Sequence, residues 1–337
     1  MHCATLRQTS STRRGSIVPK RARWSSAPRA ILPSCGRLAG ISAAVGVFAC
    51  LAAPAHAIVN AVSTGIGDAT LNGEAELILT EAGGQQFGCS GSLLTGGQYI
   101  LTAGHCLTGD DANAKTTAIS VSFLGGKVEL SATKYFVDPS WNGSVASGDD
   151  LAIIELNSPI TQISGYTIDT GSVSKQTEVL VAGYGETGTG TTGAQSNTFG
   201  TLHYGYNQYN ISSSFYDEYG ISQSVLLYDF ENTNQAMIAP GDSGGGSFVD
   251  VDGIYELVGV HDFNMCIAER CTPNSAFGTI GGDVSVAATA NIEWIDSVIG
   301  TPEPGAFALM AVGFAGLGLI RTQGRGSNRA PAQAARR

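Results

Sequence analysis

Three polar motifs lie far apart in this 337-residue chain, and only a compact tertiary fold can bring them together. The motif LTAGHC carries His105, the motif DLAII carries Asp150, and the motif PGDSGG carries Ser243. A serine hydroxyl becomes a good nucleophile only when an imidazole accepts its proton and a third group orients that imidazole. The three residues therefore predict a nucleophile, a base and a base-orienting carboxylate.

The PGDSGG motif also contains groups that can stabilise a negative oxygen. Gly241 leaves the backbone free to turn sharply before Asp242. The N–H groups of Gly241 and Ser243 can then converge on the oxygen that becomes negative in a tetrahedral intermediate. A run of Gly, Asp and Ser is by itself often only a turn, so its catalytic interpretation depends on the two motifs upstream.

Further motifs occur in the same order as in a known family, over residues 58–300. They are IVNA from Ile58, GCSGSL around Cys89, DPSW from Asp138, GYG around Tyr184 and LVGV from Leu257. Together with the order His, Asp, Ser, they resemble the trypsin/chymotrypsin-like serine proteases, because subtilisins and α/β-hydrolases order the same triad differently. The resemblance implies an all-β fold of two packed six-stranded β-barrels with a C-terminal helix. It also implies a serine endopeptidase that acts through an acyl-enzyme.

The resemblance assigns a substrate pocket as well. Met237, six residues before the nucleophile, would lie at the base of this pocket. The pocket then has no buried carboxylate to bind a Lys or Arg side chain, so we expect no preference for these residues. An apolar substrate side chain is the simplest expectation, with Phe263 also in the pocket. His261 resembles the histidine of glutamate-selective relatives, and the alternative is a buried, hydrogen-bonded strand residue. Asp262 stands where a serine commonly supports the triad aspartate, and two neighbouring carboxylates raise one pKa.

Seven cysteines favour an oxidising compartment. Three of them precede residue 58, and the other four allow three connectivities. The resemblance implies a disulfide between Cys89 and Cys106, and we expect Cys266 to pair with Cys271. A metal site of His261, Cys266 and Cys271 is the alternative, but the C-x4-C spacing is at the loose end for zinc. We therefore expect neither a metal nor a cofactor.

The two ends of the chain are basic and the middle is acidic. Residues 1–57 contain eight Lys or Arg and no acid, and residues 305–337 contain five Arg and no acid, so all 28 acidic residues and only five basic ones lie between. Such an acidic surface keeps a secreted protein soluble and argues against a nucleic acid partner, because phosphate binding needs clustered cations. We expect a protein or peptide substrate instead.

Residues 1–57 have the three parts of a secretory signal. A basic start precedes the apolar stretch Leu38 to Leu51, and small residues in Ala55-His56-Ala57 suit signal peptidase. Cleavage there would expose Ile58. In the resembled family a free N-terminal Ile-Val inserts into the protein and its ammonium pairs with the aspartate before the nucleophile, here Asp242. Export itself would then generate the active form.

Residues 301–337 form the third predicted segment. Pro302-Glu303-Pro304 precede 16 uncharged residues, Gly305 to Ile320, and five arginines follow. Sixteen is short for a membrane-spanning helix of about 20 residues. The arrangement resembles the PEP-CTERM sorting signal of Gram-negative bacteria, with a plain anchor or a packed helix as alternatives. The resemblance implies transient inner-membrane anchoring, removal of the tail by an exosortase-type enzyme, and delivery to the cell envelope or outside.

Between these ends, short β-branched and aromatic runs alternate with turn residues, which is typical of an all-β domain. Strands are expected at 77–79, 99–102, 119–123, 151–156, 179–181 and 224–227, a surface loop at 185–193 and a helix at 287–299. Two alternatives to an enzyme remain. The chain could be a non-catalytic protease-like domain, or a matrix component as its sorting signal and Gly- and Thr-rich composition suggest.

Overall fold

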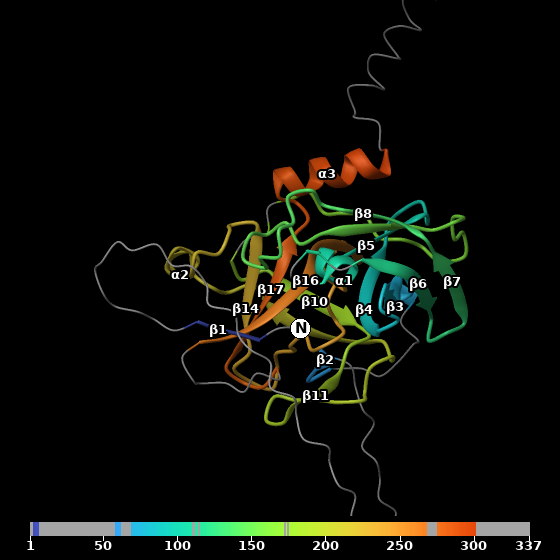
Figure 1. Cartoon of the computed structure of the whole chain (residues 1–337). Helices are drawn as coiled ribbons and strands as arrows, with labels where there is room; N and C mark the ends of the chain where they lie inside the picture. The colour runs from blue at the N-terminus through green and yellow to red at the C-terminus, as the bar shows by residue number, and fades with distance from the viewer. Residues whose placement is uncertain are drawn as a thin grey trace, which may run out of the picture.

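A computed structural model describes residues 3–6, 58–61, 69–109, 112–113, 115–171, 173, 175–267 and 275–300 of the chain. Two curled, mostly antiparallel sheets lie side by side, with a few short helices around them (Figure 1). The predicted signal segment, apart from residues 3–6, and the predicted sorting segment lie outside the described residues. Within the described ranges no helix is both long and apolar enough to cross a membrane.

The first sheet runs in the order β7-β6-β3-β4-β5-β9-β8 and closes into a barrel. Only Thr133 separates its two end strands, so one bent segment pairs with β6 through β7 and with β9 through β8. Counted as one strand, this segment gives the expected six. The strands are β3 (Glu74–Glu81), β4 (Gln86–Leu93), β5 (Tyr99–Thr102), β6 (Thr116–Phe123), β7 (Val128–Ala132), β8 (Lys134–Val137) and β9 (Ala152–Glu155).

The second sheet runs in the order β13-β10-β15-β16-β17-β14 and curls until its end strands meet. Asn207 Nδ2 donates a 2.9 Å hydrogen bond to the Asp229 carbonyl, which links the two ends. The strands are β10 (Glu178–Gly183), β13 (His203–Gln208), β14 (Val225–Asp229), β15 (Gly246–Val251), β16 (Ile254–Ile267) and β17 (Thr279–Ser285). A seventh strand, β1 (Cys3–Leu6), pairs in parallel with the end of β16.

The core follows from alternation along the strands. In β6, Ile119, Val121 and Phe123 are buried whereas Ser120 is exposed, because successive side chains point to opposite faces. The same hydrophobic cluster continues into the second sheet through Leu180, Phe248, Val260 and Val284. The two sheets therefore share one core.

Four short helical segments complete the described fold: a 3₁₀ turn (Ala69–Leu71), α1 (Gly104–Thr108), α2 (Ser213–Tyr219) and α3 (Thr289–Ile299). The predicted C-terminal helix is confirmed as α3, along one side of the molecule in Figure 1. Ile295 is fully buried, and Gly300 ends the helix in the left-handed conformation that favours glycine. Asn291 Nδ2 donates to the Gly148 carbonyl at 3.0 Å, which fastens α3 to the loop before β9.

The stretch 185–193 differs from the predicted loop. It contains β11 (Thr187–Thr189), which pairs in parallel with β2 (Ile58–Val59) and antiparallel with β12 (Gly193–Gln195). The partner β2 lies far away in the sequence, so the local glycine and threonine content could not reveal this pairing. The result is a three-stranded sheet that holds Ile58 and Val59 against the second barrel.

Candidate active site

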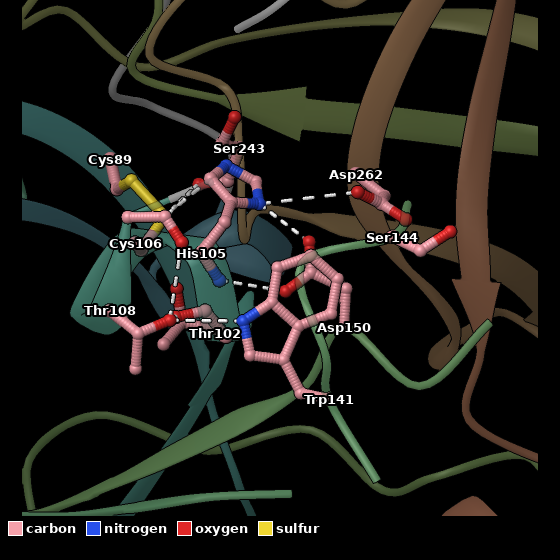
Figure 2. Close-up of polar contacts among 12 residues, drawn as sticks. Cys89, Thr102, His105, Cys106, Thr108, Trp141, Ser144, Asp150, Ser243 and Asp262 are labelled. Carbon is pink, nitrogen blue, oxygen red and sulfur yellow. Dashed lines mark hydrogen bonds and ion pairs between the residues drawn. A yellow bond between two sulfur atoms is a disulfide. The ribbon is translucent and has the colours of Figure 1, made fainter. Parts of the chain in front are cut away.

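Asp150 fixes the orientation of the His105 ring. His105 lies on α1, directly after β5, and its main-chain N–H donates to Asp150 Oδ1 at 2.7 Å. Its ring Nδ1 lies 2.6 Å from Asp150 Oδ2 (Figure 2). Because an ionised carboxylate only accepts hydrogen bonds, Nδ1 carries the proton and Nε2 has the free lone pair. This is the tautomer that a general base needs.

The fit around Asp150 depends on glycine at position 104. A Cβ on Gly104 would lie 2.8 Å from Asp150 Oδ1 and 3.1 Å from the Trp141 ring. Trp141 is itself held by a 2.9 Å hydrogen bond from its Nε1 to Thr108 Oγ1 on α1. The carboxylate is therefore buried between α1 and an indole, away from bulk water.

The Ser243 loop is held between the two barrels. Ser90 on β4 donates its N–H to the Ser243 carbonyl at 2.8 Å, and Gly244 donates its N–H to the His261 carbonyl on β16, also at 2.8 Å. Gly244 has φ +83°, and a Cβ there would lie 2.0 Å from Thr102 Oγ1. Glycine is thus required where the loop presses against the strand that leads to His105.

Ser243 lies on the Nε2 side of the imidazole, opposite Asp150 (Figure 2). Cys106 Sγ lies 3.6 Å from the Ser243 carbonyl oxygen and 3.9 Å from His105 Nε2, which places the two residues together. No hydrogen bond between the Ser243 hydroxyl and Nε2 occurs among the described contacts. Catalytic hydrogen bonds often tighten only when substrate binds. The fold thus brings the three predicted residues together, but among the described contacts the Ser243 hydroxyl is not hydrogen-bonded to His105.

The backbone around Gly241 has a conformation that requires glycine. Gly241 has φ +95°, and a Cβ there would lie 2.5 Å from the Phe199 ring, so only glycine fits. Its carbonyl accepts a 2.9 Å hydrogen bond from Ser90 Oγ. Within the described part of the chain, neither the Gly241 N–H nor the Ser243 N–H donates a hydrogen bond. Both donors are available to a developing oxyanion.

Asp242 is buried and accepts hydrogen bonds from two backbone N–H groups. Its Oδ1 accepts the Gly185 N–H and its Oδ2 accepts the Ala239 N–H, both at 2.8 Å. Burial raises its pKa to about 7, while the charge of His261 and these N–H groups oppose the rise. Ile58, its predicted partner, is also buried and pairs with Thr187, two residues beyond Gly185. In the uncut chain the nitrogen of Ile58 is a peptide amide, so no ammonium is there to pair.

Cys89 on β4 and Cys106 on α1 form the expected disulfide. The bridge closes a loop with a sequence separation of 17, and one of its sulfurs touches the Ser243 carbonyl. It therefore ties the helix of His105 to the strand beneath the nucleophile. Cys266 is also disulfide-bonded, and its expected partner Cys271 lies outside the described residues.

Replacing both Cys89 and Cys106 with alanine lowers the free energy of unfolding by about 3 kcal/mol, because the unfolded chain regains the entropy of an open loop of this length. Chemical unfolding of both proteins under oxidising conditions measures the difference. Reducing agent is the poorer test, since it also opens the bridge of Cys266. Equal midpoints for the two proteins would contradict the predicted contribution.

The other predicted pocket residues are buried. Met237 is fully buried, and its backbone exchanges two hydrogen bonds with Val59, at 2.9 and 3.1 Å. Phe263 packs in a cluster with Met265 and Ile280. Asp262 lies beside His105, with Oδ1 4.0 Å from Nδ1, near the triad aspartate as the resemblance implied. The structure thus gathers Asp262 with the triad residues.

His261 belongs to a buried polar network that the sequence did not reveal. Its Nδ1 lies 2.8 Å from Asp283 Oδ1, and Asp283 Oδ2 accepts hydrogen bonds from Tyr209 and Ser247, at 2.8 and 2.6 Å. Burial is the largest single influence and lowers the pKa of His261, but the charge and hydrogen bond of Asp283, with the charges of Asp242 and Glu74, together raise it more, so the net shift is upward. Asp283 lies in a run of small residues with no recognisable motif, so pairing of β17 with β16 was needed to find it.

Glu74 is a second group that the sequence analysis missed. It is fully buried on β3, where Ser92 Oγ donates to its Oε1 at 2.6 Å and the Gly246 N–H donates to its Oε2 at 3.3 Å. Burial raises its pKa to about 8 despite these hydrogen bonds. Glu74 therefore links the first barrel to β15, directly after the nucleophile loop.

Two groups of side chains have enough ligand atoms to be considered for a metal ion: Cys89 with His105 and Cys106, and His105 with Asp150 and Asp262. The disulfide already occupies both sulfurs of the first group. In the second group, His105 and Asp150 contact one another directly at 2.6 Å. Two atoms bound to one zinc at about 2.1 Å each stand further apart than this, so the observed geometry is that of a hydrogen bond.

Two curled barrels, with a histidine–aspartate pair on one and a glycine-flanked serine loop held between them, define the class of chymotrypsin-like folds. The family model described as Trypsin matches residues 70–281, more than half of the chain. The chain belongs to the trypsin family.

Individual relatives are distant. A trypsin-like protease of Streptomyces glaucescens is 33% identical over 115 residues, which cover 32% of this chain and 41% of that protein. Chymotrypsin-like elastase family member 1 of Homo sapiens is 26% identical over 235 residues, or 65% of this chain and 84% of that protein. The solved structure of HL collagenase is 20% identical with a TM-score of 0.55, and covers 69% of this chain and 96% of that chain. This last likeness establishes the fold alone.

Proposed function

We propose that this chain is a serine endopeptidase that hydrolyses peptide bonds through an acyl-enzyme on Ser243. The observation that carries the proposal is the His105 ring, which Asp150 holds by Nδ1 while Ser243 lies on the Nε2 side. His105 accepts the proton of the attacking hydroxyl and then gives it to the leaving amine. The N–H groups of Gly241 and Ser243 bind the oxyanion. Family membership supports the same chemistry.

A fluorophosphonate probe tests this proposal, because it reacts with a serine only when a base and an oxyanion site activate it. We expect the probe to label the protein on Ser243, as located by peptide mass spectrometry. Heat-denatured protein is the control for unspecific reaction. Labelling absent from the folded, processed protein would favour a non-catalytic protease-like domain or a matrix component.

The proposed specificity excludes Lys and Arg. Met237 is apolar, and Asn264 Nδ2 and His261 Nδ1 are bonded to the Ile238 carbonyl and to Asp283, at 2.7 and 2.8 Å. Among the described contacts, Asn264 Oδ1 and His261 Nε2 have no hydrogen-bond partner, so an apolar substrate side chain is the simplest proposal and glutamate is its alternative. Cleavage of a peptide library, with Ser243→Ala protein as the blank, identifies the preferred residue, and a preference for Lys or Arg would overturn this part.

We propose that processing of the protein begins with its export from a Gram-negative cell. Signal peptidase removes residues 1–57, and Ile58 becomes the amino terminus that pairs with Asp242. Residues 301–337 anchor the protein transiently in the inner membrane until an exosortase-type enzyme removes them, and the enzyme then acts at the cell envelope or outside. The buried position of Ile58, on the strand paired with β11, supports the first step. Sequencing both ends of the exported protein tests both cuts.

A further inference from the structure

Asp262 is the extra residue of a β-bulge in β16. His261 pairs with Asp283 and Phe263 pairs with Gly282, so β16 advances by two residues while β17 advances by one. A bulge of this kind leaves one residue unpaired and re-aims its side chain. Here the side chain points from the second barrel to the His105–Asp150 pair of the first (Figure 2).

The geometry distinguishes the two carboxyl groups. Asp150 accepts two hydrogen bonds from His105, at 2.6 and 2.7 Å, and therefore has the donors that an ionised carboxylate needs. Asp262 Oδ1 lies 4.0 Å from the same ring nitrogen, and its side chain is fully buried. Within the described residues, no N–H or hydroxyl donor forms a hydrogen bond with either oxygen of Asp262. Ligand atoms of all three residues lie within 4.8 Å of one another.

No cation offsets a charge on Asp262 within the described residues. The groups that face it are His105 on α1, Asp150 and Asp149 in the loop before β9, and Asp283 on β17. Three of these four are acidic. Lys134 is a described lysine that forms an ion pair, and its partner is Glu155 rather than Asp262. A buried, unpaired carboxylate among acids is costly enough that the group keeps its proton.

We propose that Asp262 is a neutral carboxylic acid that donates its proton in a hydrogen bond to Asp150 and so positions the carboxylate that orients His105. This inference rests on the proposed function, because it describes how the same site works. Asp262 is a positioning residue, since it acts on His105 through Asp150. One proton shared by two carboxyl groups accounts for both being buried beside one imidazole.

The residues around Asp262 determine the pH range over which its carboxyl group keeps its proton. Burial is the largest cause that raises the pKa of Asp262 well above its usual value, and the charge of Asp150 adds to it. Both causes favour the protonated acid, which is the form that donates. As the pH rises through this raised pKa, Asp262 loses its proton, the hydrogen bond breaks, and two carboxylates repel each other behind His105.

The kinetic test compares pH profiles of kcat and kcat/KM for the probe-reactive enzyme and three variants. In Asp262→Asn the amide still donates but has no proton to release, so we expect kcat within a few-fold of wild type near pH 7 and no decline at alkaline pH. Asp262→Ala lacks any donor, and kcat falls by about tenfold to a hundredfold, as expected for a lost hydrogen bond to a charged group. Asp149→Asn removes a neighbouring acid and keeps the alkaline decline of wild type.

Equal losses of kcat in Asp262→Asn and Asp262→Ala would overturn the proposal. So would an alkaline decline of kcat in Asp262→Asn that equals the decline in wild type. A second readout needs no activity. In full-length Ser243→Ala protein at neutral pH, we expect an infrared carbonyl band of a protonated carboxyl that Asp262→Asn removes. The subtraction is needed because Glu74, with a pKa of about 8, adds its own band. An unchanged spectrum refutes the shared proton, even if the chain proves not to be a protease.

Discussion

Alanine at position 243 abolishes peptide hydrolysis. We expect kcat to fall by about a millionfold, because the nucleophile of a serine protease acts as one unit with its base. The measurement is hydrolysis of the best library peptide, with probe labelling as an independent readout. Ser243 is buried and its carbonyl, rather than its side chain, holds the loop to Ser90. The variant should therefore unfold at the same denaturant concentration as wild type.

A matched control is Ser247→Ala, which removes another buried hydroxyl on the next strand. Ser247 Oγ donates to Asp283 at 2.6 Å, so this variant loses stability but keeps the nucleophile. Turnover of Ser243→Ala within tenfold of wild type would mean that Ser243 is not the nucleophile. Loss of turnover in both variants to the same degree would point to misfolding instead.

We expect cleavage directly before Ile58 to switch the proposed enzyme on. The experiment replaces residues 55–57 of the full chain with a site for a specific protease and measures probe labelling before and after the cut. In the uncut chain Asp242 has no ammonium partner, so the adjoining Gly241 and Ser243 N–H groups are less firmly held. Losing a single oxyanion donor costs about a hundredfold to a thousandfold in rate, and we expect at least this gain on cleavage.

The same cut changes how stability depends on pH. In the uncut chain the pKa of Asp242 is raised from 3.8 to about 7, so the folded state holds a proton that the unfolded chain releases. Its stabilising effect is complete below pH 3.8 and is lost as the pH rises to about 7. An ammonium at Ile58 lowers this pKa and removes that loss. Chains cut one residue later, before Val59, are the control and should behave like the uncut protein.

The strands and the triad candidates could be predicted because both leave local signals. A short β-branched and aromatic run predicted β6, and the fixed order of three motifs identified His105, Asp150 and Ser243 as the triad candidates. Their spatial proximity was expected from the resemblance alone. The activation pair, the pocket roles and the cuts at both ends stay predictions.

Features that depend on distant pairing could not be predicted. Residues 185–193 have a loop-like composition, yet β11 forms there because Ile58 and Val59 pair with it. The resemblance placed Asp262 beside the triad aspartate as well as in the pocket, but the bulge that directs its side chain to His105 appears only when β16 pairs with β17. Asp283 and Glu74 are buried acids whose partners come from other strands, and no sequence motif marks them.

The two hydrogen bonds between Val59 and Met237 join the start of the domain to the segment just ahead of the nucleophile. Under the proposed processing, maturation and substrate recognition share this stretch of backbone, so neither can be adjusted without the other. On the same proposal, the enzyme stays inactive until its leader is removed on export, so a cell that makes this chain would need no separate inhibitor in its cytoplasm.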